Sequence, residues 1–297
     1  MFRHRKRHKA LHDPSQRLLR NVAVFSMLVF FLLFFVFPII MAFVGSFYHW
    51  NPLRQQSSFT GIANWRRLFN SQLFWHSAKN TLLFAGVAVV CRVLLGLVIS
   101  QALYSKLTRC KSLYRLLYYL PTVTPIVAVA FVWKFIFDPR IGILNNLLNL
   151  QVNWLFDGKY ALVAILIFTI WKDFGYAVVM LLGSLYSLPK DCYEAAEIDG
   201  ANAWQRFRHL TIHFLKPTIL FIVVVSLISY FQAYIPVLVL TQGGPGTQTY
   251  LATYLIYQEA FTKYNFGYAS ALSFVLFAFI ALLTALSFKI SGTEGSF

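Results

Sequence analysis

Two groups of polar side chains lie inside long apolar stretches of the sequence. Thr169, Asp173 and Tyr176 are spaced four and three residues apart, so in a helix they share one face. A later stretch contains Ser226, Ser229, Tyr230 and Gln232, of which the first three share a side. Hydroxyl, carboxylate and aromatic groups together suit a carbohydrate, whose hydroxyls need hydrogen-bond partners and whose C–H faces stack on rings. Helix packing through small polar side chains is the alternative, and spacing alone leaves both interpretations open.

A polar string between two apolar stretches has the residue types of a short helix, a sharp turn and a second helix. Asp191 is suited to cap the first helix, with Glu194 completing a capping-box pattern. Gly200 is suited to end it, because glycine readily adopts the left-handed conformation common at helix ends. The string reads Glu194, Ala195, Ala196, Glu197, Ile198, Asp199, Gly200 and Ala201. An ordinary connector would explain the caps but not the whole string.

Two further patterns are considered and set aside. The glycine-rich segment 243–246 does not fit the Walker A pattern Gly-x-x-x-x-Gly-Lys-Ser/Thr, which occurs nowhere in the chain, so another polypeptide must hydrolyse any ATP. His209 and His213 have a spacing that can ligate a metal, but no acidic residue or cysteine completes the set nearby in sequence. We therefore expect no catalytic residue, no bound cofactor and no metal.

The apolar stretches are long enough to cross a membrane. Of the 297 residues, 58% are hydrophobic and 12% charged, and mean hydropathy is +0.62. Soluble domains carry about 25% charged residues, so the sequence predicts an all-α integral membrane protein. A helix of about 20 apolar residues spans the hydrocarbon core. Six transmembrane helices are expected, at approximately 22–44, 82–104, 116–137, 160–182, 219–240 and 267–288.

The distribution of basic residues predicts the orientation, because cytoplasmic loops carry an excess of Lys and Arg. Both termini are expected in the cytoplasm, with a basic tail at 1–21, a membrane domain at 22–290, the polar string in an inward loop at 187–216 and a short tail at 291–297. The basic tail then needs no nucleic-acid partner, although anionic lipid can attract it. Lys134 and Lys172 lie near the expected span ends, and their amino groups are expected to reach the membrane surface.

The string, taken with Tyr193 before it, resembles the inward loop of the permease subunits of bacterial binding-protein-dependent ABC importers. The resemblance is closer to the carbohydrate-importing branch that contains the maltose-type permeases. Further segments match that branch: Tyr119-Leu120-Pro121, Trp133-Lys134, Gly142-Ile143-Leu144-Asn145, 240–246, Tyr257 and Ala260-Phe261. The chain departs from the family at His213, where the family has a proline. Pro217, just downstream, is the alternative source of a helix kink there.

The resemblance implies the type I permease fold of ABC importers and the ATP-driven import of a carbohydrate. It implies that the helix containing Glu194, Ala195, Ala196 and Gly200 docks on a cytoplasmic ATPase, which uses ATP and Mg²⁺, and that the late spans hold the solute. The implied partners are a second, homologous permease subunit, two copies of the ATPase, an extracytoplasmic solute-binding protein and membrane lipid. The outward loops 48–79 and 242–266 would meet the binding protein at the bacterial inner membrane.

Three other interpretations stay open at this point. The same mechanism could import a polyol or glycerol phosphate. A proton-driven secondary transporter could use Asp173 and Arg92 as a relay, but such folds often contain internal repeats and none is evident here. A basic membrane-bound scaffold or receptor would explain the basic tail, but it would leave the polar string without a role.

Overall fold

The computed structural model describes residues 14–53, 57–105 and 108–291. Most of the expected basic tail at 1–21, and all but Ser291 of the tail at 291–297, lie outside these residues. The described chain is mainly helical. Its two short strands, β1 (Tyr48–His49) and β2 (Ser58–Phe59), pair antiparallel with Tyr48 opposite Phe59. The architecture therefore confirms the expected all-α class.

Within the described residues, six helical segments have the length and composition expected of membrane spans. Five are long apolar helices, and the sixth is a bent pair of helices, α5 and α6, that meets the same criteria together. The segments are α1 (Pro14–Phe31) continued by η2 (Leu32–Val36) and α2 (Phe37–Gly45), then α4 (Gln72–Tyr104), α5 (Lys111–Val123) with α6 (Ile126–Ile136), α8 (Ala161–Tyr186), α11 (Ile212–Phe231) and α14 (Phe266–Ser291).

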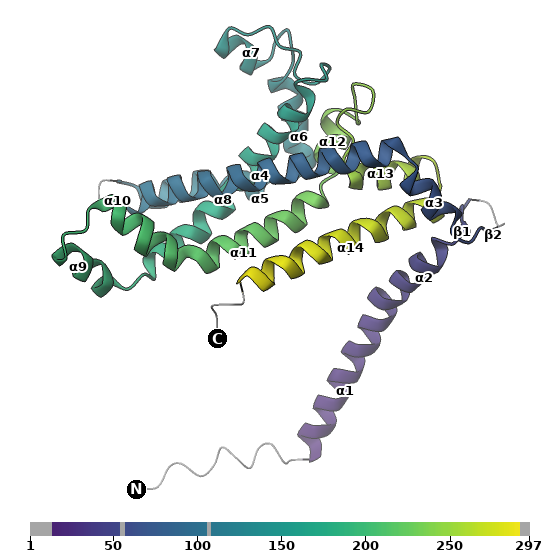
Figure 1. Cartoon of the computed structure of the whole chain (residues 1–297), viewed down its shortest axis with the longest axis horizontal. Helices are drawn as coiled ribbons and strands as arrows, with labels where there is room; N and C mark the ends of the chain where they lie inside the picture. Colours follow the sequence, from purple (N-terminus) through teal and green to yellow (C-terminus); the bar gives the residue numbers. More distant parts are fainter. Residues whose placement is uncertain (1–13, 54–56, 106–107, 292–297) are drawn as a thin grey trace.

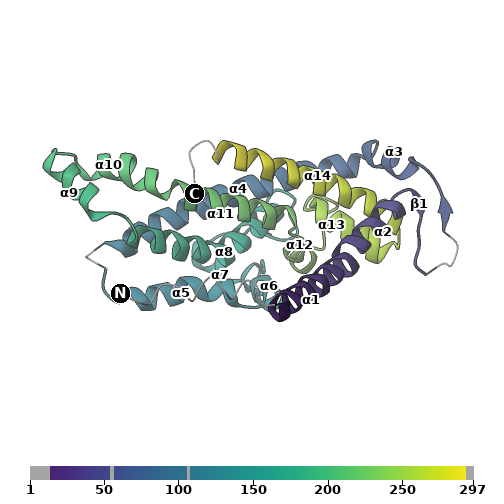
Figure 2. The same cartoon turned by 90° about the horizontal axis from the view of Figure 1, so that it is seen from below.

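Short helices connect these segments. They are α3 (Ala63–Phe69), α7 (Ile143–Leu148), α9 (Lys190–Ile198), α10 (Ala203–Arg206), η3 (Phe207–Thr211), α12 (Ile235–Leu240), α13 (Ala252–Tyr257) and η4 (Gln258–Thr262). In Figures 1 and 2, α9 and α10 lie at one end of the molecule and α3 with the strands lies at the other. We call these the α9 end and the α3 end. Figure 1 also shows α7 projecting from the bundle beyond α6.

Two of the expected spans are interrupted. The range 116–137 is divided between α5 and α6, which meet at 99°. Thr124 adopts an extended backbone (ψ 145°) immediately before Pro125, as the steric demand of a following proline predicts. The range 219–240 is divided because α11 ends at Phe231 and α12 begins at Ile235, with Pro236 in its first turn. A proline has no N–H to continue a preceding helix, so it starts a new one.

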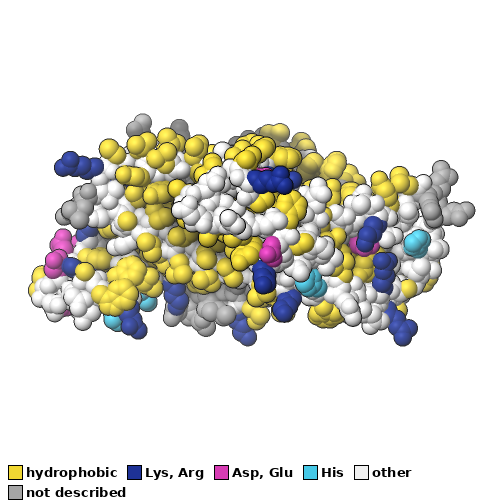
Figure 3. All heavy atoms as spheres, turned by 90° about the horizontal axis from the view of Figure 1, so that it is seen from above, with side chains coloured by type: hydrophobic (Ala, Val, Ile, Leu, Met, Phe, Trp, Pro, Cys, Tyr) yellow, Lys and Arg dark blue, Asp and Glu magenta, His cyan; other side chains and the backbone are white. Residues whose placement is uncertain are grey.

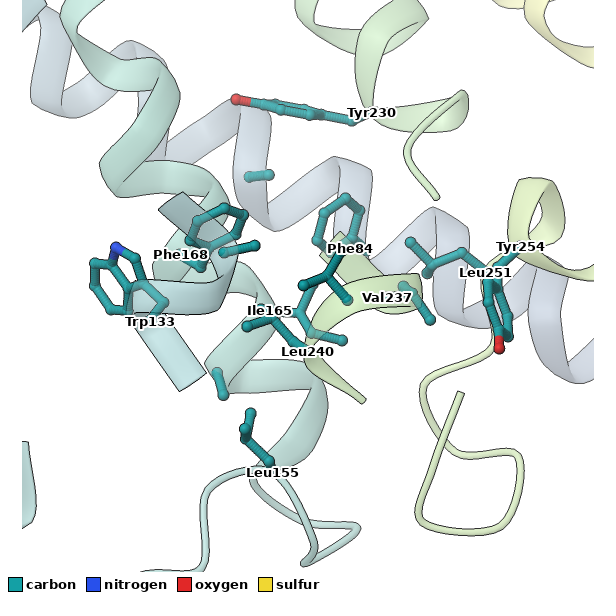
Figure 4. Close-up of a cluster of buried hydrophobic side chains, with 14 of the residues drawn as sticks. Phe84, Trp133, Leu155, Ile165, Phe168, Tyr230, Val237, Leu240, Leu251 and Tyr254 are labelled. Carbon is teal, nitrogen blue, oxygen red and sulfur yellow. The ribbon is translucent and has the colours of Figure 1, made fainter. Parts of the chain in front are cut away.

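The central helices pack together around one main core. Helix α4 packs along α8 and α11, and α11 also contacts α14. Figure 4 shows the core drawing side chains from α4, α8 and α11 and from α6, α12 and α13, with Phe84, Ile165 and Phe168 fully buried. Gly175 brings α5 directly against α8, because a Cβ atom there would overlap the carbonyl oxygen of Tyr118. The bundle therefore depends on a close approach that only glycine permits.

The first long helix stands apart from this core. None of the residues in its apolar stretch is buried, and Figure 1 shows α1 leaving the bundle while α2 remains beside α14. Hydrophobic side chains also cover much of the face shown in Figure 3, and acidic and basic side chains lie at both ends and near the middle of that face. So much exposed hydrophobic surface matches a chain in contact with hydrocarbon.

Candidate functional site

The predicted helix in the polar string exists as α9, but its first cap differs from the expectation. Pro189 occupies the cap position with an extended backbone (ψ 117°), and Asp191 lies within the first turn, so the prediction that Asp191 caps the helix is wrong. Proline suits a helix start because its missing N–H would have no partner there. The carboxylate of Asp191 still favours this end, where the helix dipole is positive.

The turn after α9 has the predicted left-handed geometry. Gly200 has a φ of +77°, and its N–H donates to the carbonyl of Glu197 at 3.1 Å. The N–H of Ala201 donates to the carbonyl of Ala196 at 2.9 Å, which completes a Schellman motif. A Cβ atom at residue 200 would meet no atom within 4 Å. Glycine is therefore needed there for its backbone conformation and not for space.

The second helix is capped by residues that the sequence interpretation missed. The Asn202 side chain accepts from the Gln205 N–H at 2.9 Å, and the Gln205 side chain accepts from the Asn202 N–H at 2.8 Å. This reciprocal capping box has a readable signal, Asn-x-x-Gln after a glycine. Helix α10 then continues through η3 into α11. The turn is thereby connected through continuous helix to one of the central helices.

Two side-chain contacts hold α9 against this second helix. Glu197 pairs with Arg206 at 3.0 Å, and the Tyr193 hydroxyl lies 2.9 Å from the Thr211 hydroxyl. Burial raises the pKa of the Tyr193 phenol above its ordinary value, so the group remains neutral and keeps a proton to donate. We call the unit at 189–211 the coupling hairpin.

The coupling hairpin presents apolar side chains to its surroundings. No residue of α9 is buried, Ile198 is 86% exposed and Trp204 is 66% exposed. Exposed apolar side chains at the end of a protein are typical of a partner-binding surface. The predicted residues Glu194, Ala195 and Ala196 lie on the same short helix.

His213 lies in the first turn of α11, exposed and edge-on to Phe214. The helix reaches this position through the π-helical turn η3 and continues across Pro217 without a break. A π-helical turn widens the backbone ladder locally. The irregularity near His213 therefore lies just before it, at 207–211.

A second group of predicted residues surrounds Arg92, a buried arginine of α4. Its Nη1 atom donates to the Ser226 hydroxyl at 2.9 Å, and its guanidinium carbon lies 5.0 Å and 5.8 Å from the ring centres of Tyr176 and Tyr230. Asp173 interacts electrostatically with Arg92 and Lys172. The structure thus brings four of the predicted residues around a cation that the sequence interpretation had named only as a possible proton relay.

Some polar atoms of this Arg92 cluster have no hydrogen-bond partner among the described residues. They are the Nε atom of Arg92, the hydroxyl of Tyr230 and the hydroxyl of the nearby predicted residue Thr169, all buried. In Figure 4 Tyr230 lies across the edge of the labelled apolar side chains. Unpaired buried polar groups cost about 1–3 kcal/mol each, so this is a place where water or solute would be stabilised.

The remaining predicted residues lie elsewhere. Ser229 and Gln232 are exposed on a different side of α11, and the Ser229 hydroxyl donates to the carbonyl of Val225 at 2.9 Å. Gln232 borders an open hollow of about 690 Å³ between α11, α13 and α14, together with Thr253 and Ser273. The seven predicted residues therefore divide between the Arg92 cluster and the outer face of α11.

Lys172 contradicts the expectation that its amino group reaches the membrane surface. Its side chain is buried, and Nζ donates to the carbonyls of Pro121 at 3.3 Å and Thr122 at 3.1 Å. The Thr122 hydroxyl in turn donates to the carbonyl of Lys172 at 3.1 Å. The last carbonyls of a helix lack donors and carry partial negative charge, so Lys172 stabilises the end of α5 at the bend.

Comparison with known proteins identifies the family. Residues 92–291 match the model described as "Binding-protein-dependent transport system inner membrane component". The lactose transport system permease protein LacF of Rhizobium radiobacter is 33% identical over 86% of this chain and 88% of its own length. The sn-glycerol-3-phosphate transport system permease protein UgpA of Pectobacterium atrosepticum is 31% identical, over 90% and 92%.

A solved structure has the same fold. It is a bacterial alginate ABC transporter in complex with an alginate pentasaccharide-bound periplasmic protein. The TM-score is 0.79 at 22% identity, covering 93% of this chain and 95% of that one. The family match and the fold agree with the arrangement of membrane helices. The chain belongs to the family of inner-membrane components of binding-protein-dependent transport systems and is an ABC importer permease, a translocation subunit.

Proposed function

We propose that the chain translocates a carbohydrate into the cytoplasm as one of two permease subunits of an ATP-driven importer. The coupling hairpin carries the mechanistic part of this proposal, because it projects exposed apolar side chains and continues as helix into the centre of the bundle. Sugars are named for several relatives, including LacF and the arabinooligosaccharide permease AraP of Bacillus subtilis, which is 29% identical over 89% of this chain. Those names support a sugar as the solute.

Helix α9 would be the element that receives the movement of the ATPase. A partner bound to Ile198 and Ala195 would displace the Schellman turn at Gly200. The capping box at Asn202 would transmit this displacement to α10. Because α10, η3 and α11 are continuous and α11 packs on α4, α8 and α14, the displacement reaches every central helix. ATP and Mg²⁺ belong to the partner in this account, and two ATPase copies would serve two permeases.

The other proposed partners match exposed surfaces. The isolated first helix, unburied throughout its apolar stretch, suits lipid and the second permease. With both termini in the cytoplasm, the α9 end faces inward, and the loops at 48–79 and 242–266 face the solute-binding protein. The first loop contains β1, β2 and α3, and the second contains α13.

The solute would pass along α8 and α11 where polar groups reach the surface. Asp173 and Tyr176 are half-buried beside Arg92, and Ser229 and Gln232 are exposed on the outer face of α11, so the solute would contact the two pairs on different sides of α11. Thr169, Ser226 and Tyr230 are buried and would act by holding Arg92 and the tyrosine rings in place. Hydroxyl-rich solutes need this mixture of acceptors, donors and rings.

Glycerol phosphate is the second candidate solute. The relationship to UgpA and the buried guanidinium of Arg92 both favour it, because Arg suits phosphate oxygens. Asp173, which lies close enough to Arg92 to interact with it, favours an uncharged solute instead.

Uptake by the complete importer distinguishes these solutes. The chain, its partner permease, the ATPase and the binding protein are reconstituted in liposomes, and labelled lactose, maltotriose, raffinose and sn-glycerol-3-phosphate are offered in turn. We expect ATP-dependent uptake of at least one of the three sugars. Uptake of glycerol phosphate alone would reject the carbohydrate proposal and leave the translocation role intact.

A further inference from the structure

A mixed aromatic and polar hollow lies away from the Arg92 cluster, where the ends of α6 and α12 meet the loops that follow them. Its volume is about 370 Å³, within the range of small-ligand sites. We call it the aromatic mouth and define it by Phe131, Lys134, Phe135, Asp138, Phe156 and Gln242. In the proposed orientation these loops face outward, so the aromatic mouth lies on the side from which solute arrives.

The walls of the aromatic mouth are held in place by the main core. Helix α12 packs on α6, and Trp133, Phe137 and Trp154 form a chain of ring contacts with centre distances of 5.1 Å and 5.9 Å beneath it. The Trp154 indole N–H also donates to the Asn145 side chain at 2.8 Å. A site with a fixed shape loses less entropy on binding than a mobile one.

Three phenylalanine side chains line the aromatic mouth without being covered. Phe131 is 53% exposed, Phe135 is 68% exposed and Phe156 is 71% exposed. Their rings are supplied by two different segments, since Phe156 lies in the loop between α7 and α8. Exposed rings arranged around a hollow offer flat apolar faces to a ligand.

The polar groups of the aromatic mouth have unused hydrogen-bonding capacity. Lys134 makes only a cation–π contact with Phe131, at 5.6 Å, and no hydrogen bond or ion pair among the described residues. One oxygen of Asp138 accepts from the N–H groups of Arg140 and Ile141 at 2.8 Å and 3.0 Å, which leaves the other oxygen free. The Ile141 and Arg140 N–H groups lower the pKa of Asp138 below its ordinary value, so it remains an ionised acceptor.

We propose that the aromatic mouth binds a ring of the incoming carbohydrate before it reaches the membrane interior. The chemistry fits one class of ligand: C–H faces that stack on phenylalanine, and hydroxyls that accept from Lys134 and donate to Asp138. An acyl chain would leave Lys134 and Asp138 without hydrogen-bond partners, and an inorganic anion would not contact the phenylalanine rings. The inference rests on the proposed carbohydrate function and adds a second, earlier binding step to it.

The test measures solute binding to the complete importer in nanodiscs without the binding protein, using labelled lactose, maltotriose and raffinose as probes. Phe156→Ala and Lys134→Gln are each expected to weaken binding of the transported sugar by roughly 10-fold or more and to raise the KM of uptake. ATPase stimulation by the binding protein should persist, because the coupling hairpin is unchanged. Lys134→Arg should retain binding, since it keeps a cationic donor.

Phe25→Ala is the matched control. Phe25 is 70% exposed, almost the same as Phe156, but lies in α1, on the other side of the bundle from α6 in Figure 1. Wild-type sugar binding and uptake in both Phe156→Ala and Lys134→Gln would overturn the aromatic mouth alone. Altered lipid content or permease pairing with an unchanged sugar Kd would also overturn it, by showing that the surface binds lipid or the partner subunit. Failure of the wild-type importer to take up any of the sugars would reject the carbohydrate function and this inference together.

Discussion

Gly200 shows how a single backbone angle can carry a functional prediction. Its left-handed conformation, with a φ of +77°, was expected from the sequence. No atom lies within 4 Å of a Cβ built at this position, so a side chain would cost free energy only through the backbone conformation. Left-handed conformation costs a non-glycine residue about 1–2 kcal/mol, and a β-branched one more. The consequences for transport should therefore depend on which residue replaces it.

Replacing Gly200 with Val should reduce ATP-driven uptake severalfold at normal membrane levels of the protein, because the Schellman turn opens and α9 loses its fixed direction. Gly200→Asn is the control, since asparagine tolerates the left-handed region, and it should retain most of the activity. Uptake and protein level are measured together. Equal activity in Gly200→Val and wild type would show that the turn does not transmit movement.

Arg92 is the residue whose role the sequence interpretation least anticipated. A charge inside an apolar run indicates a partner or a cavity, but not which residues from distant segments will supply it. Ser226 lies 134 positions away in the chain. The helical spacing of Thr169, Asp173 and Tyr176 was visible, whereas their meeting with Arg92 depends on how α4, α8 and α11 pack.

Arg92→Met should destabilise the purified complex, because it leaves the buried Ser226 hydroxyl without its donor and removes the cation beside Asp173. Losing a buried hydrogen bond in this way costs about 1–3 kcal/mol. Asp173→Leu introduced beside Arg92→Met should restore part of the lost thermal stability. Arg140→Met, at an exposed position on the loop after α6, is the control. An unchanged Tm in Arg92→Met would show that the Arg92 cluster does not hold these helices together.

At the scale of elements, apolar length predicted where helices lie better than where they break. The six expected ranges all contain helix because 20 apolar residues in succession have no other way to satisfy their backbone in a membrane. The first break lies at Pro125, and the second lies just before Pro236. Both prolines were visible in the sequence. The 99° angle between α5 and α6 was not predictable, because it also depends on Lys172 reaching the carbonyls of Pro121 and Thr122 from another helix.

Two glycines of α8 provide a paired test of its packing. Gly175→Ala should lower the unfolding temperature and separate α5 from α8, because the added Cβ overlaps the Tyr118 carbonyl. Gly183→Ala should be neutral or stabilising by about 0.5–1 kcal/mol, because nothing lies within 4 Å of its Cβ and alanine favours helix. Equal behaviour of the two variants in thermal unfolding would show that α5 does not rest on α8 as described.

The coupling hairpin can be tested through its most exposed apolar residue. Ile198→Ser should reduce ATPase stimulation by the loaded binding protein, because it removes apolar area that a partner would cover. Ile141→Ser is the control, since Ile141 is 69% exposed but lies on the loop after α6. Stimulation is measured in the reconstituted complex. Docking at α9 would be contradicted if both replacements reduced ATPase stimulation equally, or if neither reduced it.

At the scale of the whole molecule, the two ends have different chemistry and different proposed partners. The α9 end carries the coupling hairpin, and the α3 end carries the strands and short helices that the binding protein would meet. The continuous helix from α10 to α11 joins the coupling hairpin to the bundle. In the proposed mechanism the driving movement enters at the coupling hairpin, so no proton relay is needed.

The source of energy for uptake tests this account most directly. Liposomes containing the chain with its partner permease and ATPase are given loaded binding protein, and labelled sugar uptake is measured either with internal ATP or with an imposed pH gradient alone. We predict uptake with ATP, loss of uptake when the chain is omitted, and no uptake from the pH gradient. Uptake driven by the pH gradient in the absence of ATP would contradict it.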